Sequence, residues 1–203
     1  GECGDVLRNG QLFVDATTGD PEDSEHVAAD LAARGIGYVA ATIAGSSEQL
    51  RQGEAVVIVG CDAAECRRAE RVVATWGERR FVVGSAGASA RLKLVVNLVL
   101  GLNRAVLAEG LALAQACGIE PAAALEVIKA TPAYSRVMDT KGPKMVEREY
   151  RPQARLAQHL KDVRLIRELA TRLGARTPLS DLHEQLLVRG CELGYSEADN
   201  AAI

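Results

Sequence analysis

The chain has 203 residues, of which 48% are hydrophobic, 25% charged and 3% aromatic. This composition is typical of a globular protein and excludes a fibrous repeat or a disordered chain. The formal net charge of -3 provides no basic surface that would attract nucleic acid or anionic lipid, so we expect neither as a partner.

Compartment can be inferred from the first residues and from the cysteines. The opening GECGDVLRNG has no apolar core of a secretory signal. The longest apolar run, LVVNLVLGL, is shorter than the roughly 20 residues that a membrane span requires. The cysteines are odd in number and show no C-x-x-C spacing: Cys3, Cys61, Cys66, Cys117 and Cys191. We therefore expect a cytoplasmic protein with reduced thiols and no membrane partner, and interpret Cys61 and Cys66 as two buried thiols rather than a redox pair.

The first part of the chain alternates β-rich runs with helical stretches. Pro21 and the acids after it, with Gly35 at the other end, mark a capped helix. The expected elements are strands at 11–17, 36–42, 55–60 and 80–84, helices at 21–35 and 61–77, and a polar loop at 44–54. This alternation predicts an α/β layer with at least partly parallel strands.

After Gly84 the pattern becomes entirely helical. One long helix is expected over 87–117, and Gly118 ends it. Glycine and proline then divide the chain into helical segments at 120–131, 134–148, 154–173, 178–193 and 196–203. The fold class is thus α/β plus all-α, with an α/β domain at 1–86 and a helical domain at 87–203.

A glycine-rich segment, GSAGASARLK, lies at 84–93, between a strand and the long helix. It lacks the G-x-G-x-x-G spacing that holds a pyrophosphate at a helix N-terminus. The spacing favours a turn with close packing over a phosphate site.

The long helix carries a polar stripe within an apolar sequence, RLKLVVNLVLGL. Lys93, Asn97 and Gly101 follow one another at intervals of four residues and so share one face. Because a helix that is apolar nearly all round should be buried on most sides, the stripe needs a polar partner. A partly desolvated lysine can act as a proton donor. Spacing alone leaves open the alternative that Lys93 reaches solvent while Asn97 bonds a loop carbonyl.

Four motifs in order resemble those of the β-hydroxyacid dehydrogenase family, which includes 3-hydroxyisobutyrate dehydrogenase and tartronate semialdehyde reductase. DATTGDP (15–21) is similar to the D-x-S-T motif, and TIAGSS (42–47) to the P-V-S-G-G loop. GSAGASARLKLVVN (84–97) is similar to the G-x-x-G-x-G-x-x-x-K-x-x-N-N segment, and KDV (161–163) to K-D-L. The resemblance covers nearly the whole chain.

The resemblance implies the C-terminal part of a Rossmann-type sheet, a long interdomain helix and an all-helical domain like the C-terminal domain of 6-phosphogluconate dehydrogenase. It implies NAD or NADP as cofactor, a small β-hydroxyacid or its semialdehyde as substrate, and a homodimer or homotetramer. Lys93 would be the catalytic general acid/base and Asn97 its neighbour.

Six further residues acquire roles from the resemblance alone. They are a cofactor-binding set, Thr18, Lys161 and Asp162, and a substrate-binding set, Ala44, Gly45 and Ser46.

The sequence also departs from the family pattern. Ala44 replaces the pocket serine, Val96 the second asparagine and Ser89 one glycine. The N-terminal G-x-G-x-M-G units have no counterpart, so we interpret the sequence as a fragment or a truncated relative with poor dinucleotide affinity by itself. Two alternatives stay open: a non-catalytic truncated paralogue acting as an oligomerisation or partner module, and an imine-reductase-like enzyme on the same scaffold.

Other polar residues receive structural interpretations. His26, His159 and His183 have no ligand spacing to a cysteine or carboxylate, so a structural or surface role is favoured and no metal site is expected. Ser135 is expected to cap or turn a helix.

Overall fold

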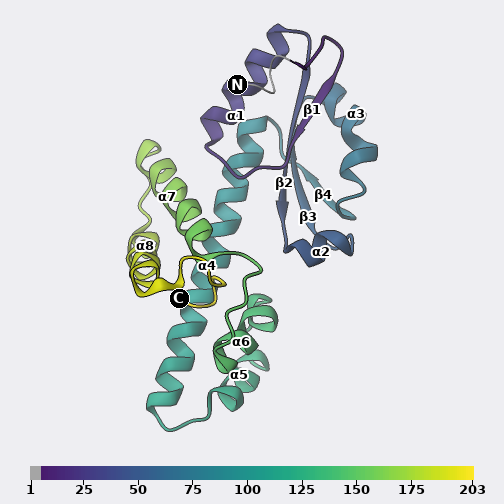
Figure 1. The fold of residues 1–203 in the computed structure, drawn as a ribbon. Helices are drawn as coiled ribbons and strands as arrows, with labels where there is room; N and C mark the ends of the chain where they lie inside the picture. Colours follow the sequence, from purple (N-terminus) through teal and green to yellow (C-terminus); the bar gives the residue numbers. More distant parts are fainter. Residues whose placement is uncertain (1–5) are drawn as a thin grey trace. The chain divides into compact units, whose positions relative to one another are not determined.

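The computed structural model describes residues 6–203 and consists of two compact units (Figure 1). One unit extends to Val96 and the other begins at Asn97. The long helix α4 (Ala86–Ala116) belongs to both. Cys3 lies outside the described residues, and the domain boundary expected between residues 86 and 87 stays a prediction.

The first unit contains a four-stranded mixed sheet, ordered β1-β2-β3-β4. Its strands are β1 (Leu12–Asp15), β2 (Gly37–Ala44), β3 (Val56–Gly60) and β4 (Arg79–Val82). β1 pairs with β2 in parallel, β2 with β3 antiparallel, and β3 with β4 in parallel. The expected α/β layer with partly parallel pairing is thus confirmed.

Helices cover both faces of this sheet (Figure 1). Successive side chains of β2 point to opposite sides, and the apolar ones on each side need cover. Val39 and Ala41 pack with the helix α3 (Ala63–Val73), whereas Tyr38 and Ala40 pack with Leu31 of α1 (Pro21–Ala33). Both clusters consist mainly of small and branched apolar residues, with Tyr38 as the aromatic member of the second.

Two expectations for the first unit are wrong. The segment expected as a loop, 44–54, contains a short helix, α2 (Ser47–Arg51), because Ser46 and Gln49 form a capping box. Cys61 and Cys66 are not buried thiols: they are half-buried and joined as a disulfide with their Cα atoms 5.7 Å apart. The cysteines remaining among the described residues, Cys117 and Cys191, are free thiols.

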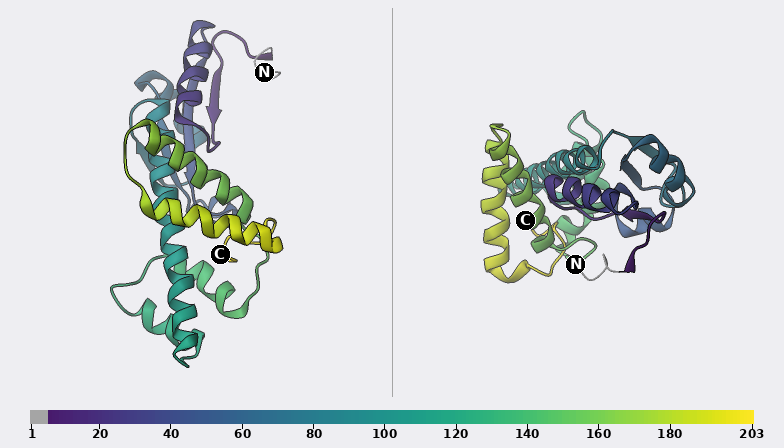
Figure 2. Two further views of the ribbon diagram at one scale, coloured as in Figure 1. Left: turned by 90° about the vertical axis from the view of Figure 1, so that its left-hand side faces the viewer. Right: turned by 90° about the horizontal axis from the view of Figure 1, so that it is seen from above.

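The second unit is helical, and no strand follows β4 in the described chain. After α4 come α5 (Pro121–Lys129), α6 (Val137–Glu147), α7 (Leu156–Arg172), α8 (Pro178–Gly190) and a π-helical turn (Cys191–Tyr195). α7 and α8 pack side by side (Figures 1 and 2). Together with the last residues of the chain, they form a core separate from that of α4, α5 and α6.

The helix expected at 196–203 is absent, and turns take its place. The carboxylate of Asp199 is fully buried and accepts hydrogen bonds from Lys141 (2.7 Å) and from the backbone amides of Gln153 (2.8 Å) and Ala201 (3.0 Å). Such side-chain-to-backbone bonds compete with helix formation. They attach the C-terminal segment to α6 instead.

α4 is less enclosed than its apolar sequence suggested. Exposed positions include Leu92 (37%), Val95 (52%), Val99 (52%) and Leu100 (45%), so the expectation of burial on most sides is wrong. By length and composition alone the helix could cross a membrane, with 33% of its most apolar window buried inside the protein. A core helix passes the same test, so this is weak evidence for a membrane span.

Candidate functional site

Ser89 fixes the start of α4 on the sheet. Its fully buried hydroxyl donates to the carbonyl of Ile58 on β3 (2.8 Å) and lies 3.2 Å from the hydroxyl of Thr42 on β2. Gly60, at the end of β3, allows this approach, because a Cβ there would stand 2.1 Å from the carbonyl oxygen of Ser85 and 2.8 Å from Cβ of Ser89. The departure from the family pattern at Ser89 thus supplies a direct bond between helix and sheet.

This anchor sets the position of Lys93 within the first unit. α4 begins beside Gly60 at the end of β3 and reaches Ile58 and Thr42 at Ser89. It therefore runs along β2 in the direction of that strand. Lys93 lies one turn, about 6 Å, beyond Ser89, and Ala44 lies two residues, about 7 Å, beyond Thr42. Lys93 thus comes level with the carboxyl end of β2.

The carboxyl ends of β1 and β2 lie at the same edge of the sheet, because the two strands are parallel. Thr18 follows β1 at this edge, and Ala44, Gly45 and Ser46 follow or end β2. The turn after β1 is held by Asp15, which accepts hydrogen bonds from the amide of Thr17 (2.8 Å) and the hydroxyl of Tyr38 (2.7 Å). Burial, together with that bond to Asp15, raises the pKa of Tyr38 and keeps it a donor. Open α/β sheets bind ligands at such edges.

Lys93 itself is 8% exposed. The alternative in which its ammonium reaches solvent does not describe the structure. Lys93 is not isolated by its burial, because it takes part in an interaction within the fold.

The loop after β2 uses some of its donors internally. The amide of Ser46 donates to Oε1 of Gln49 (2.8 Å), and the Ser46 hydroxyl accepts from the amide of Gln49 (3.2 Å). The Ser46 amide would have to leave Gln49 before it could serve the substrate-binding role expected for Ser46. Gly45 is exposed and Ala44 half-buried.

The start of α4 does not fit a pyrophosphate. The carboxylate of Glu25 lies against Gly87, where a Cβ would stand 2.0 Å from Oε1, and it pairs with Arg91 at 3.1 Å. An acidic group in this place repels an anion. The geometry agrees with the turn and close packing expected for Gly84 and Gly87.

In the second unit, Asn97 contacts α7. Its Nδ2 donates to Oδ2 of Asp162 across 3.0 Å, and Asn97 is 7% exposed. Lys161, the preceding residue, is exposed. The structure thus joins Asn97 to one of the expected cofactor residues, and the alternative of a bond to a loop carbonyl does not describe it.

One turn further along α4, a group of basic side chains is buried. Gly101 makes room for it: a Cβ there would stand 2.6 Å from Nε2 of His159 and 2.7 Å from Cε1 of His183. The two imidazole rings lie 5.1 Å apart. His159, His183 and Arg104 are 6%, 2% and 2% exposed. The structural role expected for the two histidines agrees with this burial, whereas Arg104 was not singled out from the sequence.

Burial and mutual repulsion change the pKa values in this group. Burial first, then the nearby Arg104 charge, lowers the pKa of His183 to about 4 and holds that of His159 well below its ordinary value. Burial likewise lowers the pKa of Arg104 to about 10, against the attraction of Asp199. Both imidazoles are therefore neutral at pH 7. The stripe Lys93, Asn97, Gly101 could have been extended to Arg104 from its spacing, and this is the signal that the sequence analysis missed.

The rest of the described chain offers a groove in the second unit and no metal cluster. An open groove of about 470 Å³ is lined by α4, α6 and the C-terminal segment, including Leu111, Tyr150 and Ile203. Within residues 6–203, no group of three or more histidine, cysteine or acidic side chains could hold a metal ion. The hydroxyl of Ser135 is buried without a hydrogen-bond partner in the described chain.

Comparison with known proteins gives two family matches. Residues 87–203 match the family described as NAD-binding of NADP-dependent 3-hydroxyisobutyrate dehydrogenase, and residues 3–84 match the NAD binding domain of 6-phosphogluconate dehydrogenase. The chain belongs to the β-hydroxyacid dehydrogenase family. NAD(P) is the cofactor of that family, and the roles of Thr18, Lys161 and Asp162 in binding it stay predictions; the start of α4, where Glu25 lies against Gly87, does not fit the pyrophosphate.

Individual relatives in this family are distant. The chain is 28% identical over 205 residues to the cytokine-like nuclear factor N-PAC of Aedes aegypti, covering 100% of this chain and 37% of that protein. It is 27% identical over 197 residues to the chloroplastic glyoxylate/succinic semialdehyde reductase 2 of Arabidopsis thaliana, covering 97% of this chain and 55% of that protein. The chain thus spans about a third to just over half of the length of these relatives.

The fold has a close counterpart among solved structures. The crystal structure of 3-hydroxyisobutyrate dehydrogenase from Salmonella typhimurium has a TM-score of 0.92, with 23% sequence identity, over 97% of this chain and 70% of that one. The expected combination of a Rossmann-type sheet, a long helix and a helical domain is therefore confirmed.

Proposed function

We propose that this chain carries the proton-transfer residues of an NAD(P)-dependent oxidoreductase that acts on a small β-hydroxyacid or reduces its semialdehyde. The observation that supports this most is the place of Lys93. A lysine that is 8% exposed on α4 comes level with the carboxyl end of β2, and the chain belongs to a family of hydroxyacid dehydrogenases.

In this proposal the bound nicotinamide supplies or accepts the hydride. Lys93 holds the proton of the substrate oxygen: its ammonium donates to the carbonyl oxygen in reduction and takes the proton back in oxidation.

Asn97 orients this proton transfer. One of its Nδ2 hydrogens is committed to Asp162, which fixes the amide plane. With the amide plane fixed, Oδ1 of Asn97 keeps one orientation. It can accept a hydrogen bond from a substrate hydroxyl or from the Lys93 ammonium, one turn away on the same helix. Lys161, beside Asp162, would supply a positive charge to the cofactor.

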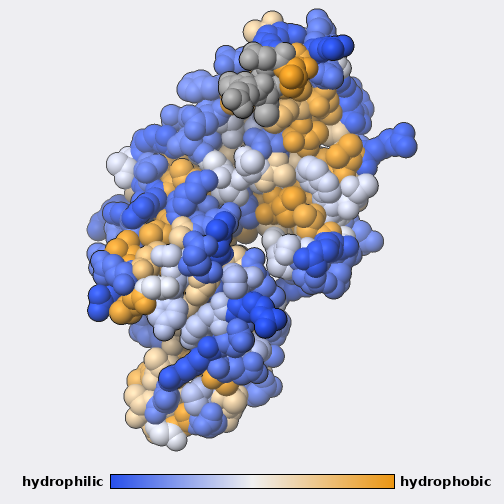
Figure 3. Space-filling model, in the orientation of Figure 1, coloured by the Kyte–Doolittle hydropathy of each residue, from blue (hydrophilic) through white to orange (hydrophobic). Residues whose placement is uncertain are grey.

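The exposed apolar side chains support a second part of the proposal, a homo-oligomer. On α4, Val99, Val106 and Leu113 are 52%, 67% and 65% exposed and recur every seven residues. On α8, Leu179, Leu182 and Leu186 are exposed, and Figure 3 shows apolar surface over this helix. A seven-residue apolar repeat is the pattern with which helices pack against each other. We therefore propose that a second copy of the chain covers the exposed apolar side chains of α4 and α8.

A non-catalytic partner module is the second candidate. It is favoured by the Glu25 carboxylate at the start of α4 and by the internal use of the Ser46 amide. Both features reduce the groups that could bind an anionic ligand.

Cofactor titration separates the two candidates. The longest natural polypeptide that contains this chain would be titrated with NADH and NADPH, followed by calorimetry. It would then be assayed with small semialdehyde acids and, for the imine-reductase alternative, with a cyclic imine. Binding with turnover of a semialdehyde acid supports the oxidoreductase, whereas a folded polypeptide that binds neither cofactor supports the partner module.

The oligomer is tested separately by light scattering. We expect Val106→Glu with Leu113→Glu to convert a dimer or tetramer into smaller species. A wild-type chain that is monomeric at high micromolar concentration would contradict the homo-oligomer and leave the catalytic proposal unaffected.

A further inference from the structure

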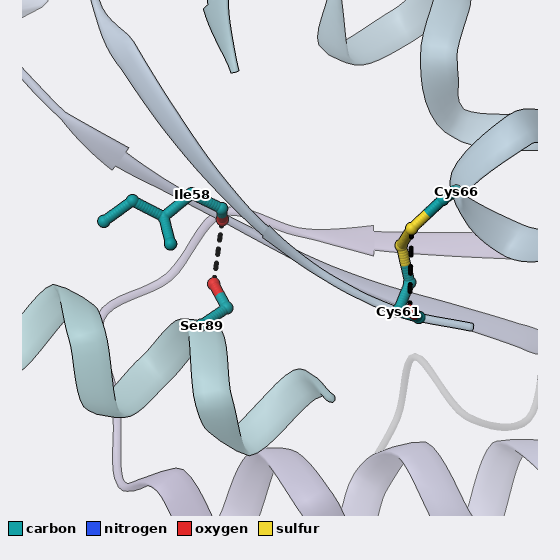
Figure 4. Close-up of a disulfide and its surroundings, with 4 residues drawn as sticks. All are labelled: Ile58, Cys61, Cys66 and Ser89. Carbon is teal, nitrogen blue, oxygen red and sulfur yellow. Dashed lines mark hydrogen bonds between the residues drawn. A yellow bond between two sulfur atoms is a disulfide. The ribbon is translucent and has the colours of Figure 1, made fainter. Parts of the chain in front are cut away.

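The disulfide between Cys61 and Cys66 joins a strand end to a helix start (Figure 4). Cys61 directly follows β3, and Cys66 is the fourth residue of α3. The bond therefore closes a short loop with four residues between the two cysteines.

A loop this short contributes less to the stability of the fold than a long one. In the chain-entropy view, a disulfide stabilises by restricting the unfolded chain, and this restriction grows with loop length. α3 is already held on the sheet by Ala69 and Val73, which are 1% and 2% exposed in the core with Val39, Ala41 and Val57. These contacts hold α3 on the sheet in addition to the sulfur bond.

The pair is partly exposed and lies at the start of a helix. Both cysteines are half-buried and pack against the core cluster of Val39, Val57 and Val59. Asp62 is the N-cap residue of α3, but its side chain makes no capping hydrogen bond. The first amides of α3 therefore receive no bond from that carboxylate, and amides at a helix N-terminus lower the pKa of nearby thiols. The acidic side chains of Asp62 and Glu65 oppose this effect.

The pair also touches the segment that positions α4. The amide of Cys61 donates to the carbonyl of Gly84 across 2.7 Å, two residues before α4 begins. Three residues before Cys61, Ile58 accepts the hydrogen bond of Ser89 (Figure 4). The strand that ends in the disulfide is thus the strand that anchors the lysine-bearing helix.

We propose that Cys61 and Cys66 form a reversible redox site that a dithiol opens and a disulfide compound closes. A thiolate of the dithiol attacks one sulfur of the pair, the Sγ–Sγ bond breaks, and the other cysteine leaves as a thiolate that takes up a proton. The second thiol of the reductant then resolves the mixed disulfide. The pair gains two electrons and two protons, and the dithiol becomes a disulfide. Opening frees the first turn of α3 from β3.

The test equilibrates the folded protein with dithiothreitol and its oxidised form over a range of ratios, followed by alkylation and peptide mass spectrometry. We expect Cys61 and Cys66 to change together in one two-electron transition, while Cys117, an exposed free thiol, is alkylated at reducing and intermediate ratios alike. We also expect backbone amides at 63–66 to exchange with deuterium several-fold faster in the reduced protein.

Cys61→Ser is the variant that separates the pair from general thiol chemistry, and Cys117→Ser is its matched control. In Cys61→Ser the cooperative transition should disappear and Cys66 should react as a single thiol, whereas Cys117→Ser should behave as wild type. Two results would overturn the proposal: Cys61 and Cys66 alkylated even in excess oxidised dithiothreitol, or a bond that resists reduction until the protein unfolds.

Discussion

Nδ2 of Asn97 donates a hydrogen bond to Oδ2 of Asp162 across 3.0 Å, joining α4 to α7. The two residues are 65 positions apart in the sequence, and each was expected in the functional site for a different role. This bond makes Asn97 a positioned side chain rather than a mobile one.

Removing this bond should destabilise the helical unit. We expect Asn97→Ala to lower the free energy of unfolding by about 1 to 2 kcal/mol, because a largely buried amide loses a charged acceptor. Asp162→Ala, which removes the acceptor, should cost a similar amount. In a double-mutant cycle measured by urea unfolding, the two changes should couple by about 1.5 kcal/mol. Asn103→Ala on the same helix is the control, and purely additive effects would contradict the bond.

Two glycines of α4 should respond oppositely to alanine. At Gly101 a Cβ would meet the buried rings of His159 and His183 at 2.6 and 2.7 Å, whereas at Gly110 nothing lies within 4 Å. We expect Gly101→Ala to destabilise by about 1 to 3 kcal/mol through overpacking. Gly110→Ala should stabilise by about 0.5 to 1 kcal/mol, because it improves helix propensity. Urea unfolding of both variants checks this, and equal effects would show that Gly101 is not packed against the histidines.

Stability should fall as the pH falls from about 6.5 towards 4. The folded-state pKa of His183 is lowered to about 4, and that of His159 is also well below its ordinary value of 6.5. In that interval the unfolded chain binds protons that the folded one does not, so protonation favours unfolding. His183 alone accounts for up to about 3 kcal/mol, at about 1.4 kcal/mol for each pH unit. Nearby Arg104 and Lys141 oppose protonation of His159 further.

Urea unfolding at pH 7.5, 6 and 5 measures this loss. His183→Leu should flatten the dependence, whereas His26→Gln, which changes an exposed histidine, should not. A wild-type stability that does not change across this range would contradict the burial of neutral imidazoles.

The fold was predictable because its elements carry local signals. Strand and helix alternation up to Gly84 indicated the mixed α/β layer, and α4 follows from an apolar run without a break until Gly118. The stripe of Lys93 and Asn97 was predictable from i, i+4 spacing. Its burial agrees with the need for a polar partner.

Three features depended on contacts that no local pattern contains. The turns at 196–203 arise from Asp199, whose carboxylate accepts hydrogen bonds from Lys141 and from a distant backbone amide. The disulfide depends on where the end of β3 meets the start of α3. The spacing on α4 could have placed Arg104 on the polar stripe. Its burial, however, depends on helices that come 50 to 80 residues later.

Single-turnover hydride transfer tests the central claim most directly. The longest natural polypeptide containing this chain would be mixed with NADPH or NADH and a small semialdehyde acid, and nicotinamide absorbance followed for wild type, Lys93→Ala and the surface control Lys129→Ala. We predict that Lys93→Ala slows the step by about 10² to 10⁴-fold, with cofactor affinity retained and partial rescue by added ethylamine, while Lys129→Ala matches wild type. A folded Lys93→Ala protein whose rate stays within about three-fold of wild type would contradict the role of Lys93 as general acid/base.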